Sequence, residues 1–166
     1  MALEIDHARA DELEAITDMW VALARGQRAH GSYVRADENR ETMRETLAAH
    51  LAADGLLVAR VDGDPVGFAS VSVERGALDL DATRGTLSNL YVEPACRNRG
   101  IGSELLEAVD AAFSEAGVDV VTLEVMADNE AARRFYRSHG FETFRVTMHR
   151  SLEDRSENDT HSKEER

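Results

Sequence analysis

A turn that contains two glycines, Arg97-Asn98-Arg99-Gly100-Ile101-Gly102, constrains the fold of this chain more than any other segment. It follows an apolar stretch typical of a strand, Leu87 to Val92, and it precedes a segment whose apolar residues recur at helical spacing. A second apolar strand, Val118 to Val125, comes after that helix. A strand, a turn, a helix and another strand in this order predict an α/β layer structure with a mixed sheet.

The same turn is a candidate anion site. The first N–H groups of a helix have no carbonyl partner within the helix, and the helix dipole places positive charge at that end. Gly100 and Gly102 allow an anion to approach the main chain closely because they lack a Cβ atom. Arg97 and Arg99 add forked donors suited to phosphate oxygens. Taken alone, the segment is also compatible with an ordinary turn that carries two surface arginines.

Periodicity along the rest of the chain predicts ten elements in the order β-α-α-β-β-β-α-β-α-β. The run Val118 to Val125 is nearly all apolar, as in a central buried strand. Asp62 to Pro65 is predicted to be a hairpin turn, and Arg75 to Gly85 a mobile loop. Strands are expected at Leu3–His7, Leu56–Val61, Val66–Val73, about Thr86–Val92, Val118–Val125 and within Phe141–Leu152, and helices at about 11–26, 37–53, 100–116 and 130–139.

Composition bounds the class of protein. The 166 residues are expected to form one domain over 1–152, followed by a disordered charged tail over 153–166. A formal net charge of −13 argues against nucleic acid and anionic membranes as partners. All but one of the 19 basic residues are arginines, which indicates either a protein adapted to high salt or a GC-rich genome. No signal peptide or membrane span is recognisable, so a cytoplasmic location is expected. The single cysteine, Cys96, excludes an internal disulfide, and no metal site is predicted.

Two motifs in this order resemble the GNAT superfamily of acyl-CoA-dependent N-acetyltransferases. The first runs from Leu90 through the glycine-containing turn to Leu106, and the second is Asn129 to Phe141, which includes Phe135-Tyr136 and Gly140-Phe141. The resemblance covers about Leu3 to Leu152. It implies a central mixed, largely antiparallel sheet of six to seven strands, splayed between the fourth and fifth strands and flanked by about four helices.

The resemblance also implies a cofactor, acetyl-CoA, and residues that bind it. Leu90, Tyr91 and Val92 correspond to the strand whose backbone binds pantetheine, which can substitute for a missing strand edge. Asn129 corresponds to an asparagine that reaches the cofactor, although it is equally suited to cap the next helix. The turn corresponds to the pyrophosphate loop; its residues are Arg97, Asn98, Arg99, Gly100, Ile101, Gly102 and Ser103.

The implied reaction is direct attack of a primary amine on the thioester in a ternary complex. Tyr136 corresponds to a tyrosine that protonates the departing thiolate; alternatively, it only packs between helix and sheet. Many relatives carry a glutamate on the strand before the loop, but this chain has no carboxylate between Thr86 and Tyr91. Water held by Ser88 or Asn89, or the carboxylate of Glu124 on the next strand, is therefore the candidate base. An acyl-enzyme on Cys96 is disfavoured because no histidine is near it in sequence.

The amine acceptor, a small molecule or a peptide, is not identified by the sequence. Its pocket is expected between the first two helices, where His30 and Tyr33 lie, and at the loop that carries Asp79 and Asp81. A homodimer is possible. Two rival functions remain open at this stage: a non-catalytic acyl-CoA sensor on the same fold, and a nucleotide enzyme. The second is disfavoured because the turn lacks the third Rossmann glycine and a Walker lysine.

Overall fold

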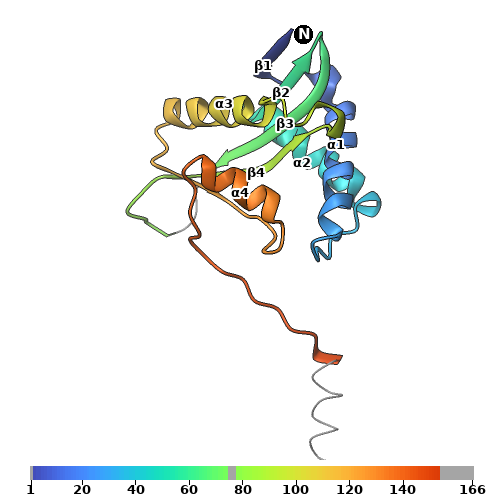
Figure 1. The fold of residues 1–166 in the computed structure, drawn as a ribbon. Coiled ribbons are helices and arrows are strands. Elements are labelled where there is room, and N and C mark those ends of the chain that lie inside the picture. Colours follow the sequence, from blue (N-terminus) through green and yellow to red (C-terminus); the bar gives the residue numbers. More distant parts are fainter. Residues whose placement is uncertain (1, 75–77, 154–166) are drawn as a thin grey trace, which may run out of the picture. The chain divides into compact units, whose positions relative to one another are not determined.

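The computed structural model describes residues 2–74 and 78–153, and it divides into two compact units, Met1–Asn129 and Glu130–Arg166. Among these described residues, the first unit contains strands β1 to β5 and helices α1 to α3, and helix α4 belongs to the second unit (Figure 1). The strands are β1 (Leu3–His7), β2 (Leu56–Val61), β3 (Asp64–Val73), β4 (Arg84–Val92) and β5 (Val120–Leu123). The helices are α1 (Leu13–Arg28), α2 (Arg40–Ala52), α3 (Ile101–Glu115) and α4 (Glu130–Ser138), with short 3₁₀ turns at 10–12, 37–39 and 94–96.

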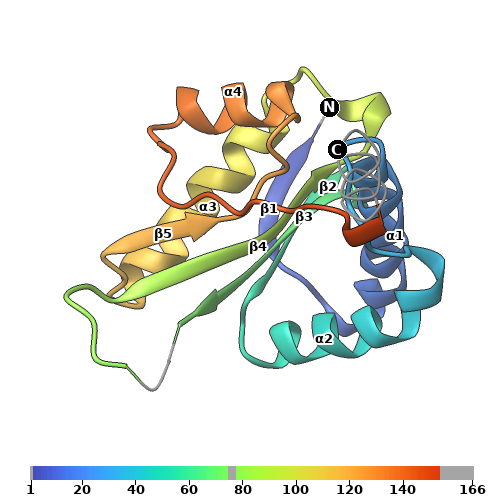
Figure 2. The same ribbon diagram turned by 90° about the horizontal axis from the view of Figure 1, so that it is seen from below.

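The sheet has the strand order β1-β2-β3-β4-β5. The first four strands are antiparallel neighbours, whereas β5 lies parallel to β4 (Figure 2). A parallel pair requires a crossover connection, and α3 provides it between β4 and β5. The sheet is therefore mixed and largely antiparallel, as predicted.

The hairpin between β2 and β3 follows from its turn residues. Val61 pairs with Asp64, so the loop consists of Asp62 and Gly63 only. Both residues have positive φ angles, 52° and 88°, which is the requirement of a type I′ turn. Aspartate followed by glycine tolerates this conformation well, which is why the sequence signal was reliable here.

Helices cover both faces of the sheet. The main core cluster lies between α1, α2 and one face, where Ile16, Leu47, Val58 and Phe68 are each fully buried. Helix α3 packs on the opposite face, where the Phe113 ring lies against Gly85 of β4 (Figure 2). A Cβ atom on Gly85 would come within 2.5 Å of that ring, so this close approach requires glycine.

Two predictions about strands are wrong. The described sheet has five strands rather than six to seven, because residues 141–150 form no strand although they alternate like one. The apolar run from Val118 forms only the four-residue β5, which is an end strand of the described sheet and not a central one. Val120 is accordingly 44% exposed. Whether an apolar strand has a second neighbouring strand depends on distant parts of the chain. The local sequence pattern therefore does not predict it.

A buried ion pair joins the first helical turn to β2. Arg60, 2% exposed, donates from Nε and Nη2 to the two carboxylate oxygens of Glu12, both at 2.7 Å, and Glu12 is 5% exposed. A further bond from Arg60 Nη2 reaches the His7 carbonyl at 3.2 Å. The hydrogen bond from Arg60 holds the pKa of Glu12 below its ordinary value, while burial acts in the opposite direction. The ion pair therefore joins the turn before α1 to β2, and it does so only while Glu12 is ionised.

Replacing Glu12 by glutamine should lower the free energy of unfolding by about 3 kcal/mol, because removal of one partner leaves a buried uncompensated charge. For a domain of this size the melting temperature should fall by roughly 6–12 °C. The pKa of Glu12 is lower in the folded protein than in the unfolded chain. The ion pair therefore stabilises the wild type fully at a pH above the ordinary pKa of glutamate, and this stabilisation is lost as the pH falls through the pKa of the folded state. Thermal denaturation of wild type and Glu12→Gln between neutral and acidic pH measures both effects.

Glu14→Gln is the matched control, since it makes the same chemical change two residues further along the chain. Glu14 also contacts two arginines, Arg40 and Arg44, but its side chain is 61% exposed. Exposed ion pairs contribute little because water and salt screen them. The melting temperature of this control should therefore be close to that of wild type. Equal decreases in melting temperature in the two variants would contradict the assignment of Glu12–Arg60 as the critical pair.

Candidate functional site

At Ser88, strand β4 loses its pairing with β5, and a β-bulge interrupts its pairing with β3. Val71 of β3 pairs with Leu87 and Ser70 pairs with Asn89, so Ser88 is the additional residue of a β-bulge. Pairing with β5 also ends at this point, since its last pair is Leu87 with Leu123. From Asn89 to Val92, β4 is paired with β3 on one side, and within the described residues no strand lies on the other side. This interval agrees with the predicted separation of the fourth and fifth strands.

The unpaired side of β4 contains the three residues expected to bind pantetheine. Leu90 and Val92 are half-buried, and Tyr91 is buried in the core cluster with its ring 6.3 Å from that of Phe68. Burial, with a smaller effect from Glu93, raises the pKa of Tyr91. The side chain of Tyr91 is thus part of the core, and only its backbone is available at the strand edge.

The turn after β4 has the conformation that its sequence predicts. A 3₁₀ turn at Pro94–Cys96 leads into it, and Asn98 and Gly100 both adopt left-handed backbone conformations, with φ of 63° and 79°. Gly100 is the N-cap of α3, whose first hydrogen bond runs from Glu104 N–H to the Gly100 carbonyl at 3.1 Å. The amides of Ile101 and Gly102 precede that bond, so they have no carbonyl four residues earlier within the helix. Residues 97–100, which lead into this helix end, are exposed.

The side chain of Arg97 connects the turn to the end of β4 through a hydrogen bond. Its Nε donates to the Val92 carbonyl at 2.8 Å, and its guanidinium carbon lies 5.5 Å from the centre of the Tyr91 ring. Both contacts orient the side chain along the strand. Arg97 is predicted from the sequence to supply charge for phosphate, and these contacts show that it also positions the turn.

The three residues considered for the general base lie in different environments. Glu124 is exposed and lies one residue beyond the end of β5, so the prediction that it belongs to that strand is wrong. The Asn89 side chain donates to the hydroxyl of Ser70 at 2.8 Å, and Ser70 is fully buried. Ser88, by contrast, is exposed at the bulge.

Tyr136 lies on α4, in the second unit. Its ring makes edge contacts with Phe135 and Phe141, at 5.3 and 5.7 Å between centroids. Burial raises the pKa of Tyr136 to about 12. The phenol therefore keeps its proton over the whole physiological range. Asn129, which immediately precedes α4, is half-buried and donates its backbone N–H to the Met126 carbonyl at 3.0 Å.

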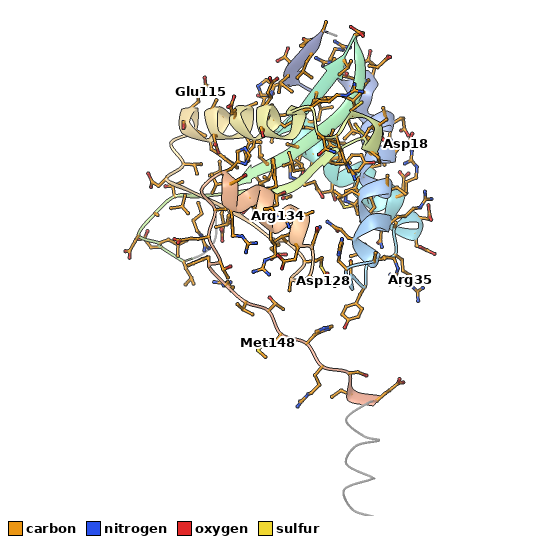
Figure 3. The ribbon with its side chains drawn as sticks, in the orientation of Figure 1. Asp18, Arg35, Glu115, Asp128, Arg134 and Met148 are labelled. Atoms are coloured by element: carbon orange, nitrogen blue, oxygen red, sulfur yellow. The ribbon has the colours of Figure 1, made fainter. Side chains whose placement is uncertain are left out.

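A contact between two distant loops was not predicted. Nδ1 of His30, in the connection between α1 and α2, lies 3.0 Å from a carboxylate oxygen of Asp128. Asp128 follows β5 and is labelled in Figure 3. An ionised carboxylate only accepts hydrogen bonds, so Nδ1 of His30 is the donor in this contact. From the sequence, only His30 is a candidate substrate contact. Their separation by 98 residues gave no signal that they meet.

The remaining candidates for the acceptor pocket are exposed. Tyr33 is 78% exposed, and Asp79 and Asp81 lie at the surface of the segment before β4, beyond residues 75–77, which are outside the described part.

Over residues 2–74 and 78–153, no group of three or more histidine, cysteine, aspartate or glutamate side chains is arranged to hold a metal ion. No helix in the same ranges is long and apolar enough to cross a membrane. The predicted tail, 153–166, lies outside the described residues except for Glu153.

The profile of the acetyltransferase (GNAT) family matches residues 14–141 of this sequence. The chain belongs to that family. An N-acetyltransferase of Archaeoglobus fulgidus, itself uncharacterised, is 30% identical over 136 residues, which cover 82% of this chain and 90% of that protein. The aminoglycoside N(6')-acetyltransferase type 1 of Stenotrophomonas maltophilia is 31% identical over 134 residues, covering 78% of this chain and 86% of that protein.

The fold is also found in solved structures. The PaiA N-acetyltransferase of Thermoplasma acidophilum, crystallised in complex with coenzyme A, superposes with a TM-score of 0.76 over 89% of this chain and 94% of that one, at 18% identity. The predicted family, the predicted enzyme class, an acyltransferase of the N-acetyltransferase type, and the predicted cofactor, acetyl-CoA, are thereby confirmed.

Proposed function

We propose that this GNAT acetyltransferase transfers the acetyl group of acetyl-CoA directly to a primary amine in a ternary complex. The observation that supports this most is the unpaired side of β4 between Asn89 and Val92, which leads into the exposed N-terminus of α3. Pantetheine carries two amides and can pair with a free strand edge, and a pyrophosphate suits a helix N-terminus. The two features follow one another along the chain, as the two parts of coenzyme A do.

In the proposed reaction the neutral amine attacks the thioester carbonyl carbon. A carbon–nitrogen bond forms, the carbon–sulfur bond breaks, and the thiolate takes a proton from Tyr136. The oxyanion of the tetrahedral intermediate accepts a hydrogen bond from a backbone N–H near Val92. The amine loses its proton to water; because the Asn89 amide is engaged with Ser70 while Ser88 is exposed, Ser88 is the better candidate to hold that water.

The acceptor pocket is assigned to the connection between α1 and α2. The hydrogen bond between His30 and Asp128 holds this connection against the segment that carries Asn129. A loop predicted to contact the acceptor is thus attached to a segment predicted to contact the cofactor. Because the related enzyme of Stenotrophomonas maltophilia is named for aminoglycosides, these polyamines belong among the first acceptors to be tested.

The test is calorimetric titration of the full chain with acetyl-CoA, coenzyme A, NADH and ATP, at low and at molar salt. We expect binding of the two coenzyme A ligands alone. Release of free thiol is then followed with aminoglycosides, polyamines, amino acids and short peptides as acceptors. Binding of coenzyme A without thiol release for any amine would favour the sensor, and no binding at either salt concentration would contradict the proposal.

A further inference from the structure

The side chain of Arg97 folds back from the turn onto β4. Its Nε donates to the Val92 carbonyl at 2.8 Å, and its guanidinium carbon lies 5.5 Å from the centre of the Tyr91 ring. Burial raises the pKa of the Tyr91 phenol, whereas the guanidinium of Arg97 acts in the opposite direction, as a nearby cation does. Tyr91 and Val92 are the last two residues of β4. The contacts of Arg97 are therefore with the end of the strand.

The Val92 carbonyl lies on the side of β4 that faces away from β3. Glu93, the next residue, donates its backbone N–H to the Val66 carbonyl of β3 at 2.7 Å. Backbone groups of successive residues in a strand point alternately to its two sides, so the N–H and carbonyl of Val92 point the other way. Within residues 2–74 and 78–153, no strand pairs with β4 there. Arg97 thus binds the free edge at the point where the edge meets the turn.

This junction is the part of the site that coenzyme A would have to span. Pantetheine at the free edge and pyrophosphate at the first turn of α3 require the edge and the turn to keep a fixed relative position. A ligand that binds both parts gains affinity from such a fixed arrangement, because less conformational freedom is lost on binding. The N–H groups of Ile101 and Gly102 and the helix dipole supply positive potential for the phosphates without a contribution from Arg97.

We propose that Arg97 is a positioning residue of the cofactor site, which holds the turn against the free edge of β4 through its Nε and does not bind the phosphates. The inference rests on the proposed function, since it takes the edge and the turn as the two parts of the coenzyme A site. It assigns the hydrogen bond to the Val92 carbonyl, and not the positive charge, as the property of Arg97 on which cofactor affinity depends.

Three substitutions separate the hydrogen bond from the charge. The side-chain nitrogen of glutamine is bonded to Cδ, as Nε of arginine is, so Arg97→Gln keeps a donor at this position and removes the charge. Lysine has a methylene group there, so Arg97→Lys keeps the charge and loses the donor at this position. Arg97→Met keeps neither. Because residue 97 is exposed, all three variants are expected to fold.

Calorimetric titration of the full chain and its variants with coenzyme A measures the ranking. Arg97→Gln should bind within about threefold of wild type, whereas Arg97→Lys and Arg97→Met should bind about tenfold more weakly, which is the scale of one hydrogen bond. The reverse order, with affinity kept by lysine and lost by glutamine, would make Arg97 a phosphate ligand and overturn the proposal. Equal affinity in all variants and wild type, or an equal loss in all three variants, would also overturn it.

Arg44→Gln and Arg44→Lys are the matched controls. Arg44 lies on α2, and its Nε also donates a hydrogen bond, to the carboxylate of Glu14. Both controls should bind coenzyme A as wild type does, and a loss in them equal to that of the Arg97 variants would contradict the assignment. If wild type itself does not bind coenzyme A, the proposed function fails. If wild type binds and the expected ranking at residue 97 is not found, only the role of Arg97 fails.

Discussion

Gly102→Glu should weaken binding of coenzyme A by about 100-fold or more while the domain remains folded. Gly102 is the second residue of α3, and its backbone N–H is one of those predicted to face the pyrophosphate. A glutamate at this position would fill the approach to the main chain and place a carboxylate beside the phosphates. Like charges about 4 Å apart repel by roughly 4 kcal/mol near a protein surface, and a 100-fold loss corresponds to only about 2.7 kcal/mol.

The folded state should tolerate this change. Glutamate has a higher helix propensity than glycine, and a negative charge in the first turn of a helix is favourable. The melting temperature of Gly102→Glu should therefore equal or exceed that of wild type, while calorimetric titration shows the loss of affinity for coenzyme A.

Gly26→Glu is the control with the same residue types. Gly26 also lies within a helix, α1, and an added Cβ there meets nothing within 4 Å. Its affinity for coenzyme A should match that of wild type. If Gly102→Glu binds coenzyme A as tightly as wild type, the turn is not part of the cofactor site. If both variants lose affinity for coenzyme A, added negative charge weakens binding wherever it is placed.

Tyr136→Phe should lower the turnover number by about 100-fold and change the affinity for coenzyme A by no more than a few-fold. A positioned general acid contributes about 10²–10⁴-fold, and the variant removes only the hydroxyl group. Phenylalanine keeps the ring that contacts Phe135 and Phe141, so the fold of α4 should be unchanged. Steady-state thiol release and calorimetric binding separate the two effects.

The pH dependence gives a second test of Tyr136. Because its pKa is raised to about 12, the phenol is protonated and able to donate at every pH below that value. Activity of the wild type should therefore show no alkaline decline due to this group between pH 7 and 10. An unchanged turnover number in Tyr136→Phe would assign the proton to another donor, and a loss confined to affinity would make Tyr136 a binding residue.

Most helices and turns could be predicted from the sequence because their causes are local. The hairpin at Asp62-Gly63 and the helix ends at Gly117 and Gly140 all require positive φ angles, and the structure has them at each glycine. Helix periodicity predicted α1 to α4 to within about three residues of the observed ends. In the candidate site, the turn at 97–102 was predictable for the same reason, since its conformation depends on glycine and on the helix that follows.

Long-range features were not predictable in this way. The end position of β5 depends on which strands pair with it, and an apolar run reads the same at the centre and at the end of a sheet. Nothing in the alternation of residues 141–150 reports whether a neighbouring strand is present. The two contacts that connect distant segments, Glu12 with Arg60 and His30 with Asp128, join residues 48 and 98 positions apart.

The sequence by itself therefore determined the order of the elements, the conformation of the turn after β4 and, through two motifs, the enzyme family. These depend on backbone preference and on side-chain spacing within a few residues. Only the tertiary structure decided where β4 separates from β5. That point is the bulge at Ser88, where the register between β3 and β4 shifts by one residue and the pairing of β4 with β5 ends. Register is a property of several segments at once, so no single segment encodes it.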